Sequence, residues 1–258
     1  MKITFLGTGT SQGVPVIGGR HADLDLSNPK NWRTRTSAFV ELSACKILVD
    51  SAPEMRLQCL KNNISYADLF ILTHGHADHI AGMDDLRRFC DVMEDNVMPV
   101  YSNDYGLERI RAMFPYALDA QPRSRGYPCF KIAKMPDTLE LPNGVTVKSV
   151  ELPHGPVKTL GLVFEEAGKK IAYFTDCKML SERAIELARN ADILAIDALR
   201  PKVHPSHLSV EEAIGYVREI EPKKAFFIHT TAQLDYAKWE PALPEPCHMA
   251  YDGLSVEI

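Results

Sequence analysis

The chain has 258 residues, of which 45% are hydrophobic, and this length suffices for one domain with a substantial buried core. Its formal net charge is −5 and its pI is near 6.0. Proteins that bind nucleic-acid backbones, by contrast, need clustered Lys and Arg. We therefore expect a small-molecule substrate and no nucleic-acid partner.

Short runs rich in Val, Ile and Phe alternate with helical patterns along the chain. The runs, bounded by turn residues, predict strands at 2–7, 38–42, 46–51, 68–73, 145–152, 161–166, 170–176, 192–197 and 224–229. Apolar residues three and four apart predict helices at 54–62, 81–93, 105–114, 180–191 and 209–220. Ser209 with Glu212 forms a capping-box pattern, and Ser181 is a predicted N-cap. The alternation indicates an α/β layered fold.

Two further features of the sequence concern the number of domains and the location of the protein. Residues 1–258 show no internal repeat or linker, so we predict a single domain, with the less regular, proline-containing segment 99–136 as a substrate-side insertion. The N-terminal apolar run is too short for a signal peptide, and the scattered cysteines form no C-x-x-C pair. These observations predict a cytoplasmic protein with reduced thiols and no membrane partner.

A dense polar cluster follows the apolar strand DLFILT. His74, His76, Asp78 and His79 form the pattern H-x-H-x-D-H. A loop leaving a strand can aim alternate side chains at one point, and imidazole with carboxylate suits Zn, Mn or Fe better than Ca or Mg. In the alternative interpretation Asp78 merely caps the next helix, but four ionisable residues after a buried strand carry a desolvation cost that capping does not require. Two adjacent metal sites are therefore predicted.

Metal-ligand residue types also end three later predicted strands. They are His154, Asp176 and His229, each of which, taken singly, is most simply a loop residue. Together with H-x-H-x-D-H, their order resembles the metallo-β-lactamase fold superfamily. The resemblance implies an αββα sandwich, in which two β-sheets pack face to face with helices on the outer faces. It assigns one divalent ion to His74, His76 and His154 and a second to Asp78, His79 and His229, with Asp176 as the bridge.

Motifs along nearly the whole chain resemble the phosphoribosyl cyclic phosphate phosphodiesterases of the PhnP type. They are GTGTSQGVP (7–15), THGHADH (73–79), FTD (174–176), IDALRP (196–201), SHLSVEEA (206–213) and FIHTT (227–231). The resemblance implies hydrolysis of a small cyclic phosphodiester, of the phosphoribosyl 1,2-cyclic phosphate or 2′,3′-cyclic nucleotide type. Two ions would supply hydroxide at neutral pH, and protonated His207 would act as general acid. His207 and Asp78 are the predicted catalytic residues, and a homodimer is expected.

The resemblance also assigns supporting roles. Asp50, which closes ILVDS, matches the aspartate that braces the histidine loop, although a turn aspartate is an alternative. For His207 the alternative is a solvent-facing residue at a helix start. Arg200, Lys202 and His204 are predicted to bind substrate, the two basic side chains by holding a phosphate.

One departure from the family pattern concerns a second zinc site. Phosphodiesterases of this type often carry a cysteine cluster after G-V-P that holds a structural zinc, whereas VIGGRHADLDLSNPKNW (16–32) has no cysteine. No structural zinc site is therefore expected, and His21 with Asp23 and Asp25 is interpreted as a solvated loop.

Three other functions share the predicted ligands. A ribonuclease Z-like enzyme would need a basic arm that this acidic chain does not show, and a glyoxalase II-like thioesterase leaves GTGTSQGVP and the histidine pair before the last predicted helix without a role. A non-catalytic metal-binding accessory protein would bind metal without turning over any ester.

Overall fold

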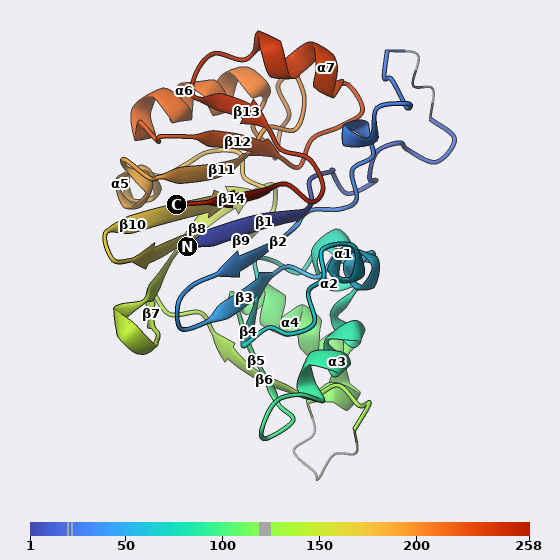
Figure 1. Ribbon diagram of the computed structural model, residues 1–258, viewed down its shortest axis with the longest axis vertical. Helices are drawn as coiled ribbons and strands as arrows, with labels where there is room; N and C mark the ends of the chain where they lie inside the picture. Colours follow the sequence, from blue (N-terminus) through green and yellow to red (C-terminus); the bar gives the residue numbers. More distant parts are fainter. Residues whose placement is uncertain (20, 22, 119–124) are drawn as a thin grey trace.

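The computed structural model describes residues 1–19, 21, 23–118 and 125–258, which form two mixed seven-stranded β-sheets (Figure 1). The first sheet has the order β14 (Ser255–Glu257), β1 (Lys2–Gly7), β2 (Ser37–Glu41), β3 (Lys46–Val49), β4 (Leu69–Leu72), β5 (Met98–Ser102) and β6 (Phe130–Lys134). The second has the order β13 (Cys247–Met249), β12 (Ala225–Ile228), β11 (Ile193–Asp197), β10 (Lys169–Phe174), β9 (Val157–Glu166), β8 (Thr146–His154) and β7 (Thr138–Glu140).

The helices lie outside the two sheets (Figure 1). The α-helices are α1 (Met55–Lys61), α2 (Ala77–Ile80), α3 (Arg87–Cys90), α4 (Asp104–Met113), α5 (Glu182–Ala188), α6 (Val210–Ile220) and α7 (Tyr236–Trp239). The 3₁₀ turns are η1 (Pro29–Asn31), η2 (Met83–Leu86), η3 (Pro115–Ala117), η4 (Pro142–Gly144) and η5 (Glu240–Ala242). Among the described residues, no helix has both the length and the apolar character needed to cross a membrane.

Strand alternation explains the layers. Ile71 of β4 and Ala195 of β11 point into the core between the sheets, while their neighbours Leu72 and Ile196 point outward. The outward side chains of the first sheet pack against α1, α3 and α4, and those of the second pack against α5 and α6. Because both faces of each sheet are apolar, each sheet needs a cover on both sides. The predicted αββα sandwich is confirmed.

The topology brings distant segments to one end of the sandwich. Strands β3 to β6 run parallel to one another in the first sheet, and β10 to β13 do so in the second. The carboxyl ends of parallel strands share one sheet edge, which is where α/β proteins place their ligands. Asp50 follows β3, His74 follows β4, Asp176 follows β10, and His229 follows β12.

The segment 99–136 is more regular than predicted. It contains most of β5, all of α4 and all of β6, and β5 and β6 extend the first sheet in parallel register. β5 was not predicted because it contains Pro99, and proline normally indicates an edge strand or the end of a strand. Much of the segment is thus regular secondary structure, although its residues 119–124 lie outside the described residues. That the segment is a substrate-side insertion stays a prediction.

The prediction of one continuous helix at 81–93 is wrong. The chain forms α2, η2 and α3 in succession, because the Gly82 amide donates to the Ser51 carbonyl, 2.9 Å away, instead of continuing a helical ladder. By contrast, the local capping signals are confirmed. Ser209 and Glu212 form a reciprocal capping box at α6, and the Ser181 side chain accepts from the Ala184 amide at α5.

The cysteine-free segment 16–32 is tied to the chain after β12 by hydrogen bonds. Asp235 accepts from the Asn31 side chain at 2.7 Å and from the Asp25 amide at 3.0 Å, and the Tyr236 amide donates to Asn31 at 2.8 Å. These bonds connect the segment to residues 235 and 236. That no structural zinc is bound stays a prediction.

Asp252, in the C-terminal segment, forms hydrogen bonds to the glycine-rich loop GTGTSQGVP (7–15). Its two carboxylate oxygens accept from the amide and hydroxyl of Thr8, both at 2.9 Å, and of Thr34, at 2.7 and 2.6 Å. Asp252→Ala removes four hydrogen bonds at once, so we expect the free energy of unfolding to fall by about 2–4 kcal/mol. Urea denaturation measures this change.

The matched control is Asp137→Ala. Asp137 pairs with Arg183 at 3.0 Å, but both side chains are largely exposed, so this variant should change stability by less than about 0.5 kcal/mol. Equal stability of the two variants would contradict the role given to Asp252.

Candidate metal centre

The residues at the strand ends adopt an unusual backbone conformation. Asp50, Asp176 and His229 have φ values of 60°, 47° and 58°, in the left-handed region that ordinary residues rarely occupy. Such conformations cost free energy and persist where surrounding contacts impose them, often at functional sites. Here they turn three polar side chains at the strand ends into the space between the sheets.

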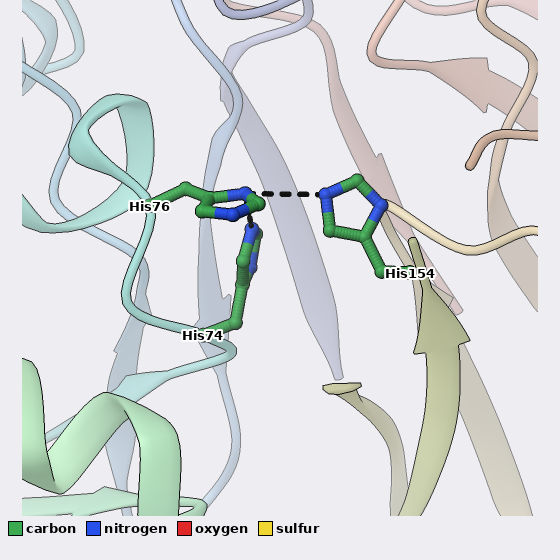
Figure 2. A group of neighbouring side chains, drawn as sticks. All are labelled: His74, His76 and His154. Atoms are coloured by element: carbon green, nitrogen blue, oxygen red, sulfur yellow. Dashed lines mark hydrogen bonds between the residues drawn. The ribbon is translucent and has the colours of Figure 1, made fainter. Parts of the chain in front are cut away.

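Three histidines form the first group (Figure 2). His76 Nδ1 lies 2.9 Å from His74 Nε2 and 3.1 Å from His154 Nε2. His74 and His76 come from the loop after β4, and His154 ends β8 of the opposite sheet. Burial holds the pKa of His74 well below its ordinary value, and burial together with His154 lowers that of His76. Neutral imidazoles with converging nitrogen atoms are what a metal ion requires.

The second group lies beside the first. Asp78, His79, Asp176 and His229 are all buried, and one ligand atom from each lies within 4.8 Å of the others. Burial alone would lower the pKa of His79, but Asp176 and Asp78 raise it well above its ordinary value. Asp78 lies within α2 and not at its N-cap, which is His76, so the alternative role as a capping residue is wrong.

Asp176 lies between the two groups. Its Oδ1 is 3.2 Å from His79 Nε2 and 3.2 Å from His229 Nδ1, while its Oδ2 is 4.0 Å from His74 Nε2 and 3.9 Å from His154 Nε2. Burial favours the protonated acid, yet His229 and His79 hold the pKa of Asp176 well below its ordinary value. One carboxylate oxygen therefore faces each group, as a bridging ligand would.

The donor set fits divalent metal ions. The buried atoms Asp78 Oδ2 and His79 Nε2 lie 3.2 Å apart, and neither has a hydrogen-bond partner. Leaving buried polar atoms unpaired is costly, and a cation would satisfy both. Imidazole and carboxylate ligands suit Zn, Mn or Fe. The cluster thus has the composition, burial and convergence of a metal-binding site.

Asp50 forms hydrogen bonds to two residues of the histidine loop. Its Oδ2 accepts from His79 Nδ1 at 2.7 Å and from the Thr73 hydroxyl at 2.8 Å, and its Oδ1 accepts from the Thr73 amide at 2.7 Å. The carboxylate thereby fixes the tautomer of His79 and leaves Nε2 facing the second group. Such hydrogen bonds behind a ligand orient it and raise its basicity.

The glycine-rich loop is connected to His229 through Thr36. A β-carbon on Gly9 would lie 2.6 Å from the Arg33 carbonyl oxygen, so only glycine allows this close approach. The Thr36 hydroxyl lies 2.9 Å from the Gly9 carbonyl and 3.0 Å from His229 Nδ1. Sequence reasoning missed Thr36, because nothing in its local pattern indicates that the residue just before β2 lies beside His229.

His207 lies at the edge of the cluster. Its Nδ1 is 2.8 Å from Asp197 Oδ2, and its ring is 4.6 Å from the His154 ring and stacked at 5.0 Å on that of His229. Burial lowers the pKa of His207, but Asp197 outweighs this effect and raises it to about 9. Its side chain is buried, so the alternative of a solvent-facing residue is wrong.

Asp197 is a functional candidate that sequence reasoning missed. It ends β11 at the same sheet edge as Asp176, and its position at a strand end was the available signal. It orients His207 as a buried carboxylate orients a catalytic imidazole. His154, Asp176 and His207 also lie within 4.8 Å of one another, so the geometry allows His207 as a metal ligand too.

The predicted substrate-binding residues have contacts that give less support to their predicted role. Arg200 donates to the carbonyls of Lys202 and Val203 in its own loop, at 3.2 and 3.1 Å, and Lys202 is exposed. His204 is half-buried with its ring 5.2 Å from that of His207. Phosphate binding by Arg200 and Lys202 stays a prediction that this geometry does not favour.

The fold and the cluster agree with comparisons to known proteins. An octanoyltransferase from Porphyromonas gingivalis is 34% identical over 263 residues, covering 100% of this chain and 52% of that protein. This chain thus spans about half the length of that curated relative. A diphosphatase from the PhnP family has a crystal structure that matches with a TM-score of 0.88 at 30% identity, covering 100% of this chain and 97% of that chain.

A third similarity concerns the fold alone. Zn²⁺-bound PqqB from Methylobacterium extorquens matches with a TM-score of 0.81 at 19% identity, over 100% of both chains. Residues 46–230, more than half of the chain, match the family model of the β-lactamase superfamily domain. The chain therefore belongs to the metallo-β-lactamase superfamily.

Proposed function

We propose that the protein is a metal-dependent phosphodiesterase that hydrolyses a small cyclic phosphodiester, of the phosphoribosyl 1,2-cyclic phosphate or 2′,3′-cyclic nucleotide type. The observation that carries the proposal is the Asp197–His207 pair, 2.8 Å apart, at the edge of a seven-residue His/Asp cluster. A thiolate can leave without protonation, so thioester hydrolysis has little need of such an acid, whereas an alkoxide leaving group benefits from a proton donor. The likeness to a PhnP-family diphosphatase supports phosphoester chemistry.

The two groups would hold one divalent ion each. His74, His76 and His154 form one site, Asp78, His79 and His229 the other, and Asp176 faces both. Bound there, Zn or Mn would acidify a water molecule and offset the charge that grows on the phosphoryl oxygens.

The protein's own residues supply the remaining functions. Asp50 holds the orientation of His79 through the 2.7 Å hydrogen bond to Nδ1. Asp197 accepts from His207 Nδ1, which leaves Nε2 as the proton donor toward the departing ribose oxygen. The substrate is small because the cluster is buried between two sheets. The net charge of −5 also argues against a nucleic-acid substrate, whose phosphates are bound by clustered Lys and Arg. We further propose that the protein forms a homodimer, because symmetric dimers are the commonest oligomers of soluble proteins.

One observation favours a second candidate, the hydrolysis of an acyl thioester. The relative from Porphyromonas gingivalis is named an octanoyltransferase, and it is 34% identical along this entire chain. An octanoyl thioester is therefore the thioester to test. A metal-binding accessory protein would bind ions and turn over none of these esters.

The deciding experiment offers three substrates to protein reloaded separately with Zn and Mn. They are a ribose 1,2-cyclic phosphate, a 2′,3′-cyclic nucleotide and an octanoyl thioester. We expect turnover of a cyclic ester that a chelator abolishes and that added metal restores, because ions held by these ligands would lower the pKa of the attacking water.

Each other outcome contradicts the phosphodiesterase proposal in its own way. Thioester turnover alone would assign the protein to acyl chemistry. Stoichiometric metal binding without turnover of any of the three would assign it a binding role. Activity that survives complete metal removal would exclude the metal-dependent mechanism.

A further inference from the structure

The loop that carries His207 is in contact with the first group of histidines. The Ser206 carbonyl lies 3.0 Å from His154 Nδ1, while His154 Nε2 lies 3.1 Å from His76 Nδ1. Because a carbonyl oxygen can only accept, this contact places the proton of His154 on Nδ1 and leaves Nε2 to face the group. Ser206 is the neighbour of His207, so one loop positions both a candidate ligand and the candidate acid.

The two residues that follow Asp176 both reach the His207–Asp197 pair. The Cys177 amide donates to Asp197 Oδ2 at 3.1 Å, and this oxygen also lies 2.8 Å from His207 Nδ1. The Lys178 ammonium donates to the His207 carbonyl at 3.4 Å. The loop that presents the candidate bridging ligand therefore also holds the carboxylate and the backbone of the candidate acid.

Lys178 is anchored to helix α6 as well. Its Nζ donates to Glu212 Oε1 at 2.6 Å, and Glu212 Oε2 accepts from the amide and the hydroxyl of Ser209, both at 2.8 Å. The Lys178 and Glu212 side chains are 27% and 33% exposed, and an ion pair with such exposure contributes little to overall stability. Its effect is local, because the same ammonium joins the capping box of α6 to the His207 carbonyl.

We propose that Lys178 is a positioning residue that holds His207 in place for proton donation. This inference rests on the proposed phosphodiesterase function and names a residue that acts through His207. Asp197 sets the rotation of the His207 ring, whereas the contact from Lys178 restrains the backbone that carries the ring. A displacement of a catalytic group by about 1 Å can lower a rate about 10²-fold, so a smaller shift of this loop should still be measurable.

The test offers two diesters with different leaving groups to the metal-loaded protein. The ribose oxygen of a 2′,3′-cyclic nucleotide leaves as an alkoxide and needs a proton, whereas the p-nitrophenolate of bis(p-nitrophenyl) phosphate leaves without one. We expect Lys178→Met to lower kcat on the cyclic nucleotide about tenfold, with KM and metal content unchanged, and to leave turnover of the p-nitrophenyl ester within about twofold. Lys178→Arg keeps a donating cation, so it should retain most of the wild-type kcat.

Lys148→Met is the matched control. Lys148 pairs with Glu165 at 2.6 Å, and the two side chains are 32% and 27% exposed, close to the values for Lys178 and Glu212. It lies near the start of β8, whereas His154 ends that strand. This variant should turn over both esters as the wild type does. Equal losses on the two esters in Lys178→Met would overturn the proposal, since a general disturbance of the metal centre affects both.

A measurement without substrate separates this inference from the proposed function. The His207 Nδ1 proton, held by buried Asp197, should exchange slowly with water and give its own NMR resonance, which His207→Gln would remove. In Lys178→Met this proton should exchange about tenfold faster than in the wild type and in Lys148→Met, because the loop opens more often. Unchanged exchange would overturn the role of Lys178. Faster exchange without turnover of either diester would contradict the phosphodiesterase function and leave Lys178 as the residue that holds His207.

Discussion

Asp176→Asn is expected to lower kcat/KM by at least about 10³-fold and to deplete the bound metal, because one carboxylate serves both groups. Its two oxygens lie 3.2 Å from His79 and His229 and about 4 Å from His74 and His154. The amide keeps the size of the side chain but loses its negative charge and one acceptor. Metal content per chain, measured by mass spectrometry after dialysis, and initial rates check the prediction.

Asp192→Asn provides the control. Asp192 is a buried aspartate just before β11, at the opposite end of the same sheet, where it pairs with Lys223 at 2.7 Å. The loss of this carboxylate should leave metal content and turnover unchanged. Should Asp176→Asn retain both ions and normal turnover, Asp176 would not be a bridging ligand.

His207→Gln is expected to lower turnover by about 10²–10⁴-fold while leaving metal content unchanged, because a general acid contributes about that much. His207 is held by Asp197 and stacked on His229. His248→Gln is the control, since His248 is also paired with a carboxylate, Glu240, but lies on β13. Loss of metal from His207→Gln would instead make His207 a ligand, which its distance from His154 and Asp176 allows.

The same prediction includes a pH dependence. Asp197 raises the pKa of His207 to about 9 against the lowering effect of burial, and a general acid must be protonated. Activity should therefore fall as the pH rises through the pKa of His207. Asp197→Asn removes the negative charge that raises the pKa of His207, while the lowering effect of burial on that pKa remains. The alkaline limb of log kcat/KM should therefore move to lower pH. A limb that does not move between wild type and variant would contradict the general-acid role.

Much of the metal centre could be predicted from the sequence, because its signals are local or fall at strand ends. H-x-H-x-D-H places four residues on one short loop, and a buried run before it marks the strand that ends there. The caps at Ser181 and Ser209 depend on contacts three residues along the chain, and both are as predicted. His154, Asp176 and His229 needed the family resemblance as well, because a single polar residue after a strand has many ordinary explanations.

The short strands could not be predicted in the same way. β7, β13 and β14 have only three residues each, and they are strands because a longer neighbour pairs with them. β5 carries a proline, yet it lies between β4 and β6. Strand formation at such positions is decided by cross-strand contacts and burial, which have no local pattern.

The sequence by itself determined the α/β layering and the histidine loop, and its family resemblance added the sandwich, the order of the ligand residues and the histidine beside them. Only the tertiary structure decided which side chains support them: Asp197 against His207 and Thr36 against His229. The physical reason is that these partners meet across sheets or loops far apart in the chain. Their contacts follow from the way the strands pair and the two sheets pack, and not from any spacing along the sequence.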